Sequence, residues 1–267
     1  MKWIKETPQT IVAEYKSLQY QIENLRPTEI VVNGNNYIVE HEIITTMLDG
    51  KAISALTNTP SSMTCPNCKA NPKDFDKLDY VKNLQISEES LSYGISPLHM
   101  YIRALEYILH IAYRLDLKKW RVPKNEKPIM TEKKNEIQRQ FRILVGLVID
   151  QVQPGSGTSN TGNVARRFFS DPEFASEITG VNSEIITNLK YMLVALNSGF
   201  SINTEAFNEI GLETAKLHIE KYPWFKIPQS MHRLFIQASR IIENAQCQSG
   251  ILLKKHWKLV INVVLEH

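Results

Sequence analysis

Apolar residues recur at intervals of three and four along most of the sequence, and this spacing limits the chain largely to helices. The pattern is clearest between residues 97 and 117, where the predicted buried stripe consists of Leu98, Ile102, Leu105, Leu109 and Ala112. Further helices are predicted at residues 8–25, 132–145, 182–197, 203–220 and 229–244. With 11 glycines and 12 prolines in 267 residues, the composition excludes a collagen-like chain and disfavours a many-stranded β-fold.

Two segments depart from the helical spacing. Residues 29–32 and 37–39 are rich in strand-forming residues and are separated by the sequence NGNN, which predicts a β-hairpin because glycine and asparagine tolerate positive φ. Residues 153–162, QPGSGTSNTG, are predicted to form a flexible loop that leads into a helix. The expected fold class is therefore α+β and mostly helical.

Three cysteines, Cys65, Cys68 and Cys247, are too few for a disulfide framework, but the first two form a CPNC motif. Two thiolates at this spacing can bind one Zn²⁺ at the ends of a tight knuckle. Because the sequence has no second CxxC, the other ligands of such a site would have to be histidines. The alternative is a reduced cysteine pair that only forms a turn. The histidines available are His41, His99, His110, His218, His232, His256 and His267.

The loop that ends at Gly162 is a candidate anion site. Its glycines, serines and threonines lead into a helix N-terminus, where free N–H groups point outward, and Arg166 and Arg167 follow one turn later. It lacks the GK[ST] ending of a P-loop. Two interpretations remain, a contact to a nucleic-acid phosphate and a solvated linker with two surface arginines. The net charge of +3 and the pI of about 8.6 permit a polyanion partner without requiring one.

No apolar run approaches the roughly 18 residues that a membrane span needs. The start of the chain, MKWIKETPQT, also lacks the apolar core of a signal peptide. We therefore expect no membrane partner and a location in the cytosol or the nucleus.

Four blocks follow one another within residues 1–252: MLDGKAISALTNTPSSMTCPNC, ISPLHMYIRALEYILHIAYRLDLKKW, GTSNTGNVARRFFSDPEFASEITGVN and EKYPWFKIPQSMHRLFI. Together they resemble the Transib-type DNA transposases, which are relatives of the catalytic subunit of the V(D)J recombinase, the recombination-activating protein. The resemblance implies a nuclear, DNA-binding protein that acts on transposon terminal repeats and forms a homodimer. It also implies an RNase H-like core that cleaves DNA with Mg²⁺, a helical insertion domain, and a zinc site of CxxC and two histidines.

The resemblance assigns roles to individual residues and ranges. Residues 1–60 would be a partial nuclease core, 61–95 the zinc knuckle region and 96–252 the helical insertion. Asp49 matches the second catalytic acid of the family, whereas the Asp49-Gly50 pair by itself predicts a helix stop and a turn. The matching zinc ligands are Cys65, Cys68 and His232, and the matching DNA-proximal residues are Asn163, Arg166 and Arg167.

The sequence departs from the family pattern at both catalytic and zinc positions. Only 48 residues precede Asp49, so the first catalytic aspartate and its strands are expected to be missing. Gln237 stands where the family has its second zinc histidine, and a neutral amide is a poor Zn²⁺ ligand. The zinc site would then be impaired, with three ligands at most from that set.

The third departure lies after Gly250-Ile251-Leu252. At this point the family has a motif like SEEALEASNK, and the last glutamate of that motif is the third catalytic acid. A one-base shift of the codons for the following residues can spell that motif. Because Trp257 has the single codon TGG and lysine codons begin with AA, the shifted codon across Trp257 and Lys258 must encode glutamate. We therefore interpret residues 253–267 as an out-of-frame tail created by a one-base deletion.

Three functional interpretations follow from these comparisons of residues. The first is a degenerate transposase fragment that binds DNA weakly, holds no productive Mg²⁺ and does not cleave, because two of the three carboxylates needed for two-metal chemistry are absent. The second is an active endonuclease or recombinase seen through a faulty gene model. The third is a non-catalytic interaction module that zinc stabilises.

Overall fold

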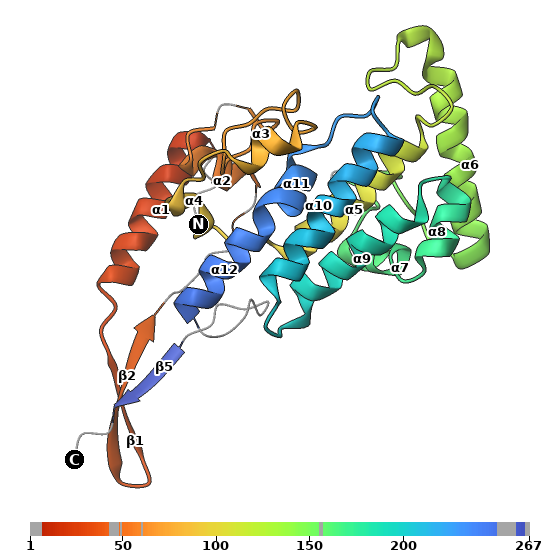
Figure 1. The fold of residues 1–267 in the computed structure, drawn as a ribbon. Helices are drawn as coiled ribbons and strands as arrows, with labels where there is room; N and C mark the ends of the chain where they lie inside the picture. The colour runs from red at the N-terminus through yellow and green to blue at the C-terminus, as the bar shows by residue number, and fades with distance from the viewer. Residues whose placement is uncertain are drawn as a thin grey trace.

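The computed structural model describes residues 7–42, 48, 50–59, 61–154, 157–249 and 260–264. Most of these residues are helical, and the longer helices pack side by side into one body (Figure 1). Helix α1 (Pro8–Glu23) lies beside α2 (Gly50–Leu56), and a small sheet projects from the same end of the molecule. The prediction of a mostly helical α+β fold is confirmed at this level.

Helix α5 (Pro97–Ala112) lies inside the body and has a long buried face. The Ser96 side chain caps it by accepting a hydrogen bond from the His99 backbone N–H, and Pro97 occupies the first turn, where no N–H is required. The stripe predicted from the sequence is partly wrong, because Leu98 is 40% exposed at the end of the helix. The neighbours of α5 are α7 (Gly162–Phe168), α8 (Pro172–Thr179), α9 (Ser183–Ser198) and α11 (Gln229–His232).

The other predicted helices are present with shifted ends. Helix α6 (Lys127–Val145) begins earlier than predicted, because Pro128 fits its first turn, and it stops at Gly146, which has a φ of 60°. None of the helices in the described ranges is both long and apolar enough to cross a membrane. The remaining helices are α3 (Leu78–Lys82), α4 (Glu88–Leu91), α10 (Thr204–Lys221) and α12 (Ala238–Ser249), with a short 3₁₀ turn at Lys124–Glu126.

The predicted single helix at 229–244 is interrupted. A π-helical segment, Arg233–Gln237, separates α11 from α12. Helix α10 packs closely against this segment, and a Cβ atom added to Gly211 would collide with the Phe235 carbonyl oxygen. Apolar spacing does not distinguish this segment from an α-helix, because a π turn adds only one residue to the regular repeat.

The predicted hairpin is confirmed. Strands β1 (Thr28–Val32) and β2 (Asn35–Glu42) pair antiparallel, and the turn between them has positive φ at Asn33 (53°) and Gly34 (83°). Strand β5 (Val260–Val264) adds antiparallel to the other edge of β2. Because β-ladder hydrogen bonds use only backbone groups, this pairing does not test whether residues 253–267 are out of frame.

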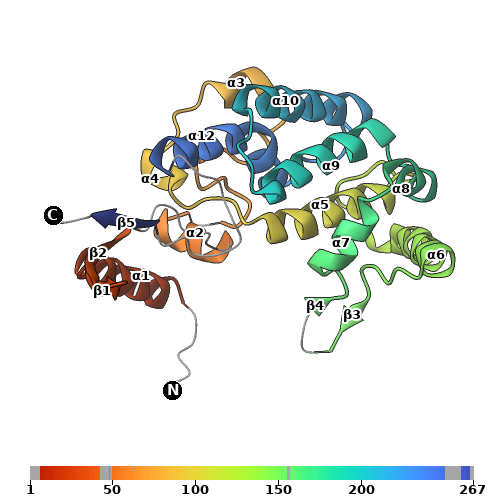
Figure 2. The same cartoon turned by 90° about the horizontal axis from the view of Figure 1, so that it is seen from below.

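The flexible loop predicted at 153–162 is partly structured. Strands β3 (Val152–Gln153) and β4 (Gly157–Thr158) form a second, very short hairpin. Side chains extend this order, since Asn160 Oδ1 accepts a hydrogen bond from the Asp150 backbone N–H at 2.8 Å. The segment therefore leads from α6 to α7 through this short hairpin (Figure 2).

Candidate metal centre

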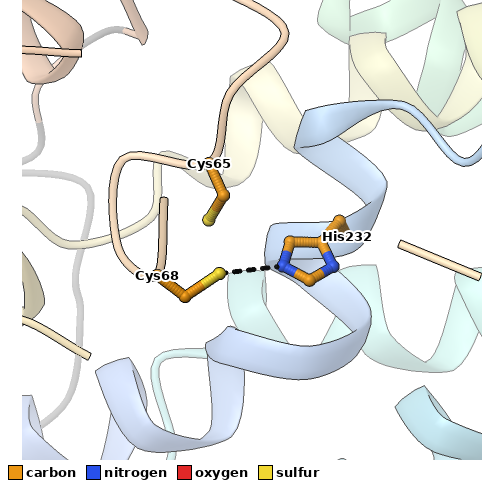
Figure 3. A group of neighbouring side chains, drawn as sticks. All are labelled: Cys65, Cys68 and His232. Carbon is orange, nitrogen blue, oxygen red and sulfur yellow. Dashed lines mark hydrogen bonds between the residues drawn. The ribbon is translucent and has the colours of Figure 1, made fainter. Parts of the chain in front are cut away.

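The CPNC motif folds into a tight knuckle, as predicted. The Cys65 backbone N–H donates to the Ala70 carbonyl, and the Lys69 N–H donates back to the Cys65 carbonyl, both at 2.9 Å. Lys69 closes the turn with a positive φ of 59°. Both cysteine side chains are buried and free of disulfide bonds, and their sulfur atoms face the same space beside the His232 ring (Figure 3).

The third member of the cluster is His232, which follows Cys68 by 164 residues and lies at the end of α11. Its Nε2 lies 3.3 Å from the Cys68 Sγ, and the ligand atoms of Cys65, Cys68 and His232 all lie within 4.8 Å of one another. The Phe75 ring stacks on the imidazole at a centroid distance of 4.1 Å and an interplanar angle of 13°. This stacking and the burial of His232 fix the direction in which Nε2 points.

The surroundings of Cys65 favour the deprotonated form of its thiol. The Cys68 thiol donates a hydrogen bond to Cys65, and this bond, together with His232, holds the pKa of Cys65 well below its ordinary value. The pKa of Cys68 is raised, first by its hydrogen bond to Cys65 and then by burial. The pair therefore shares a proton that a bound cation would displace, because thiolates are the form that ligates metals.

These three residues could hold a metal ion. A tetrahedral ion with M–S bonds near 2.3 Å and M–N bonds near 2.05 Å separates its sulfur and nitrogen ligands by about 3.6 Å. The observed 3.3 Å between Cys68 Sγ and His232 Nε2 is close to that separation. Two thiolates and one imidazole suit a soft or borderline divalent ion rather than Mg²⁺, which prefers oxygen ligands.

His218 could have replaced a missing metal ligand, but both of its ring nitrogens make hydrogen bonds to other residues. Its Nε2 donates to the Phe225 carbonyl at 2.7 Å, so its Nδ1 is the unprotonated nitrogen that accepts from the Tyr107 hydroxyl at 2.6 Å. Burial lowers the pKa of His218 to about 4, so the ring is neutral. Both ring nitrogens are used in this network, and His218 is not a metal ligand; His256 lies outside the described residues.

Arg233 and Asn67 support the cluster, although no sequence pattern predicted a role for them. The Arg233 side chain, which is almost completely buried, donates from Nε to Asn67 Oδ1 at 3.0 Å and from Nη2 to the Gly94 carbonyl at 2.6 Å. Burial lowers the pKa of Arg233 to about 10, and the nearby Cys65 opposes that shift. Because Asn67 lies between the cysteines and Arg233 follows His232, this hydrogen bond ties the knuckle to the ligand-bearing helix. The one sequence feature that could have pointed to Asn67 and Arg233 is that each is a neighbour of a predicted metal ligand.

The residues predicted to lie near DNA share α7. Arg166 lies over the Tyr101 ring at 5.2 Å and donates weakly to Asn163 Oδ1 at 3.4 Å. Arg167 is exposed and donates from Nη2 to the Val145 carbonyl at 2.6 Å. These contacts orient both guanidinium groups, and Arg167 keeps donors that face solvent. Asp49, the predicted catalytic acid, lies outside the described residues.

No known protein-family model matches this chain, and no curated protein matches it either. The resemblance to Transib-type transposases therefore stays a prediction that rests on the four sequence blocks and their residues.

Proposed function

We propose that this chain is a zinc-stabilised, DNA-binding fragment of a Transib-type or V(D)J-recombinase-like transposase that does not cleave DNA. The observation that carries the proposal is the buried group of Cys65, Cys68 and His232. The family resemblance names these same three residues as zinc ligands, although 164 residues separate the last two. In this proposal the ion is Zn²⁺, the β1–β2 hairpin is the remnant of an RNase H-like core, and the helical body is the insertion domain.

The DNA contact is assigned to α7 in this proposal. Asn163 and Arg167 are exposed, and Arg166 is half-buried beside them. Amide and guanidinium donors of this kind commonly bind backbone phosphates without reading the base sequence. The affinity should therefore depend strongly on salt and weakly on sequence.

Cleavage is not expected from the sequence as given. Two-metal phosphoryl chemistry needs several carboxylates around ions about 4 Å apart, and Asp49 is the one family acid that has a match here. Mg²⁺ would then have no complete binding site. Divalent-metal-dependent nicking of terminal-repeat DNA by the purified chain would favour the active endonuclease instead.

The DNA proposal is tested by measuring duplex binding by fluorescence anisotropy over a range of salt concentrations. Substituting Arg166→Gln and Arg167→Gln together should reduce affinity by about 10-fold and lower the salt slope by about 2, because two phosphate contacts are lost. The matched control is Arg240→Gln, since Arg240 is an exposed arginine on α12, which lies away from α7 in both views of the molecule. Equal loss in the control and the double variant would contradict a specific role of α7.

An interaction module is the second candidate function, and one surface favours it. Five large apolar side chains at the end of α6 and in the segment after it are 37–84% exposed. Large apolar side chains that stay exposed can mark protein-binding surfaces. They are Ile143, Leu144, Val145, Val148 and Val152. Zinc-dependent folding without any DNA affinity would favour this candidate.

A further inference from the structure

The buried amide of Gln237 has no partner within the described structure. Gln237 is fully buried, and neither its Oε1 nor its Nε2 makes a hydrogen bond. Buried amide groups are nearly always paired in folded proteins, so one with both atoms unpaired calls for an explanation such as an ion. The three-residue metal group lacks a fourth ligand among the His, Cys, Asp and Glu side chains that the structure describes.

The π-helical segment relates Gln237 to the ligand His232. Gln237 follows His232 by five residues and is the last residue of that segment. In a regular α-helix, residues five apart point about 140° away from each other. In π geometry the hydrogen bonds join residues five apart, so one turn brings residue 237 back toward the face of residue 232.

The amide oxygen has the reach and the chemistry of a ligand. Oε1 of glutamine lies as many covalent bonds from the backbone as Nε2 of histidine does. Side-chain amide oxygens are established metal ligands, although weaker ones than imidazole for zinc. With two thiolates, a neutral imidazole and a neutral amide, the charges of the ligands balance a divalent ion.

We infer that the Gln237 Oε1 closes the fourth coordination position of a divalent ion held by Cys65, Cys68 and His232. This inference rests on the proposed metal centre. It makes the centre an S₂NO site with one weak ligand rather than a site with three protein ligands and an open position.

The test is titration of the full-length protein with Co²⁺ and then with competing Zn²⁺, read by the visible absorption of Co²⁺. Gln237→Leu, which removes the oxygen but keeps the volume, should weaken binding about 10- to 100-fold and change the Co²⁺ spectrum. Gln237→His should tighten binding and shift the spectrum toward that of an S₂N₂ site. The matched control is Asn188→Leu, because Asn188 is another buried amide with an unpaired nitrogen, and its substitution should leave metal affinity unchanged.

The outcomes distinguish a failure of the proposed role of Gln237 from a failure of the proposed metal centre. Unchanged affinity and spectrum in Gln237→Leu, with binding lost in Cys68→Ser, would overturn the role of Gln237 and leave the three-ligand centre standing. Absence of Co²⁺ binding in the unsubstituted protein would overturn both. If Gln237→Leu does not fold, Gln237→Glu takes its place, because an anionic oxygen at the same position should bind more tightly, and equal or weaker binding would contradict the inference.

Discussion

His218 is a buried titratable residue whose two ring nitrogens both make hydrogen bonds, to Tyr107 and to the Phe225 carbonyl. A proton added to Nδ1 would break the bond from Tyr107 and place a charge in the core. Arg233 is the opposite case, a buried cation whose N–H groups donate hydrogen bonds to Asn67 Oδ1 and the Gly94 carbonyl, and whose pKa burial lowers only to about 10. At the residue scale, His218 therefore links the stability of the helical core to pH.

The depressed pKa of His218 predicts a loss of stability in acid. In the unfolded chain the ring takes up a proton near pH 6.5, whereas in the folded protein its pKa is about 4. Between those values the unfolded state binds more protons, so the free energy of unfolding falls as the pH falls from 6.5 to 4, by about 3 kcal/mol in total.

Urea unfolding at several pH values measures this term, with His218→Gln as the comparison because glutamine does not titrate. The variant should show a smaller decrease in stability between pH 6.5 and 4 than the unsubstituted protein. Parallel curves for the two proteins would show that His218 does not supply the difference.

The π-helical segment is the element on which the site depends, because it joins the ligand helix α11 to α12 and lies against α10. Gly211 allows that contact, since a Cβ there would meet the Phe235 backbone. Periodicity predicted the helix but not the π segment, because one extra residue in a turn barely changes the apolar spacing. By contrast, the Asn33-Gly34 turn was predictable because its positive φ values follow from local chemistry.

Gly211→Ala should destabilise the protein, although alanine is the better helix former by about 1 kcal/mol. The new methyl group meets backbone that cannot rotate away, so α10 and the π segment must separate, at a net cost of about 1–3 kcal/mol. Thermal unfolding measures the effect, and Gly50→Ala in α2 is the matched control, because nothing lies within 4 Å of its Cβ position. A Gly211→Ala protein as stable as the control would mean that the two helices do not touch as described.

At the scale of the whole molecule, the candidate metal centre brings together a knuckle at Cys65–Cys68 and a helix that ends at His232. Spacing alone predicted the CPNC knuckle, but residue patterns could not select His232 among seven histidines, because the pairing depends on how the intervening helices pack. The family resemblance supplied that residue. The pairing of β5 with β2 was equally beyond local patterns, since it joins segments more than 200 residues apart.

The central claim is that a zinc ion bound by Cys65, Cys68 and His232 stabilises this fold. The most direct measurement is the zinc content of the purified full-length protein, followed by thermal unfolding with and without a chelator. We predict one zinc per chain and a decrease in Tm of about 10 °C on chelation, which corresponds to losing a ligand present at about 1,000 times its Kd. Protein without zinc, with the same Tm in chelator as in added Zn²⁺, would contradict the claim.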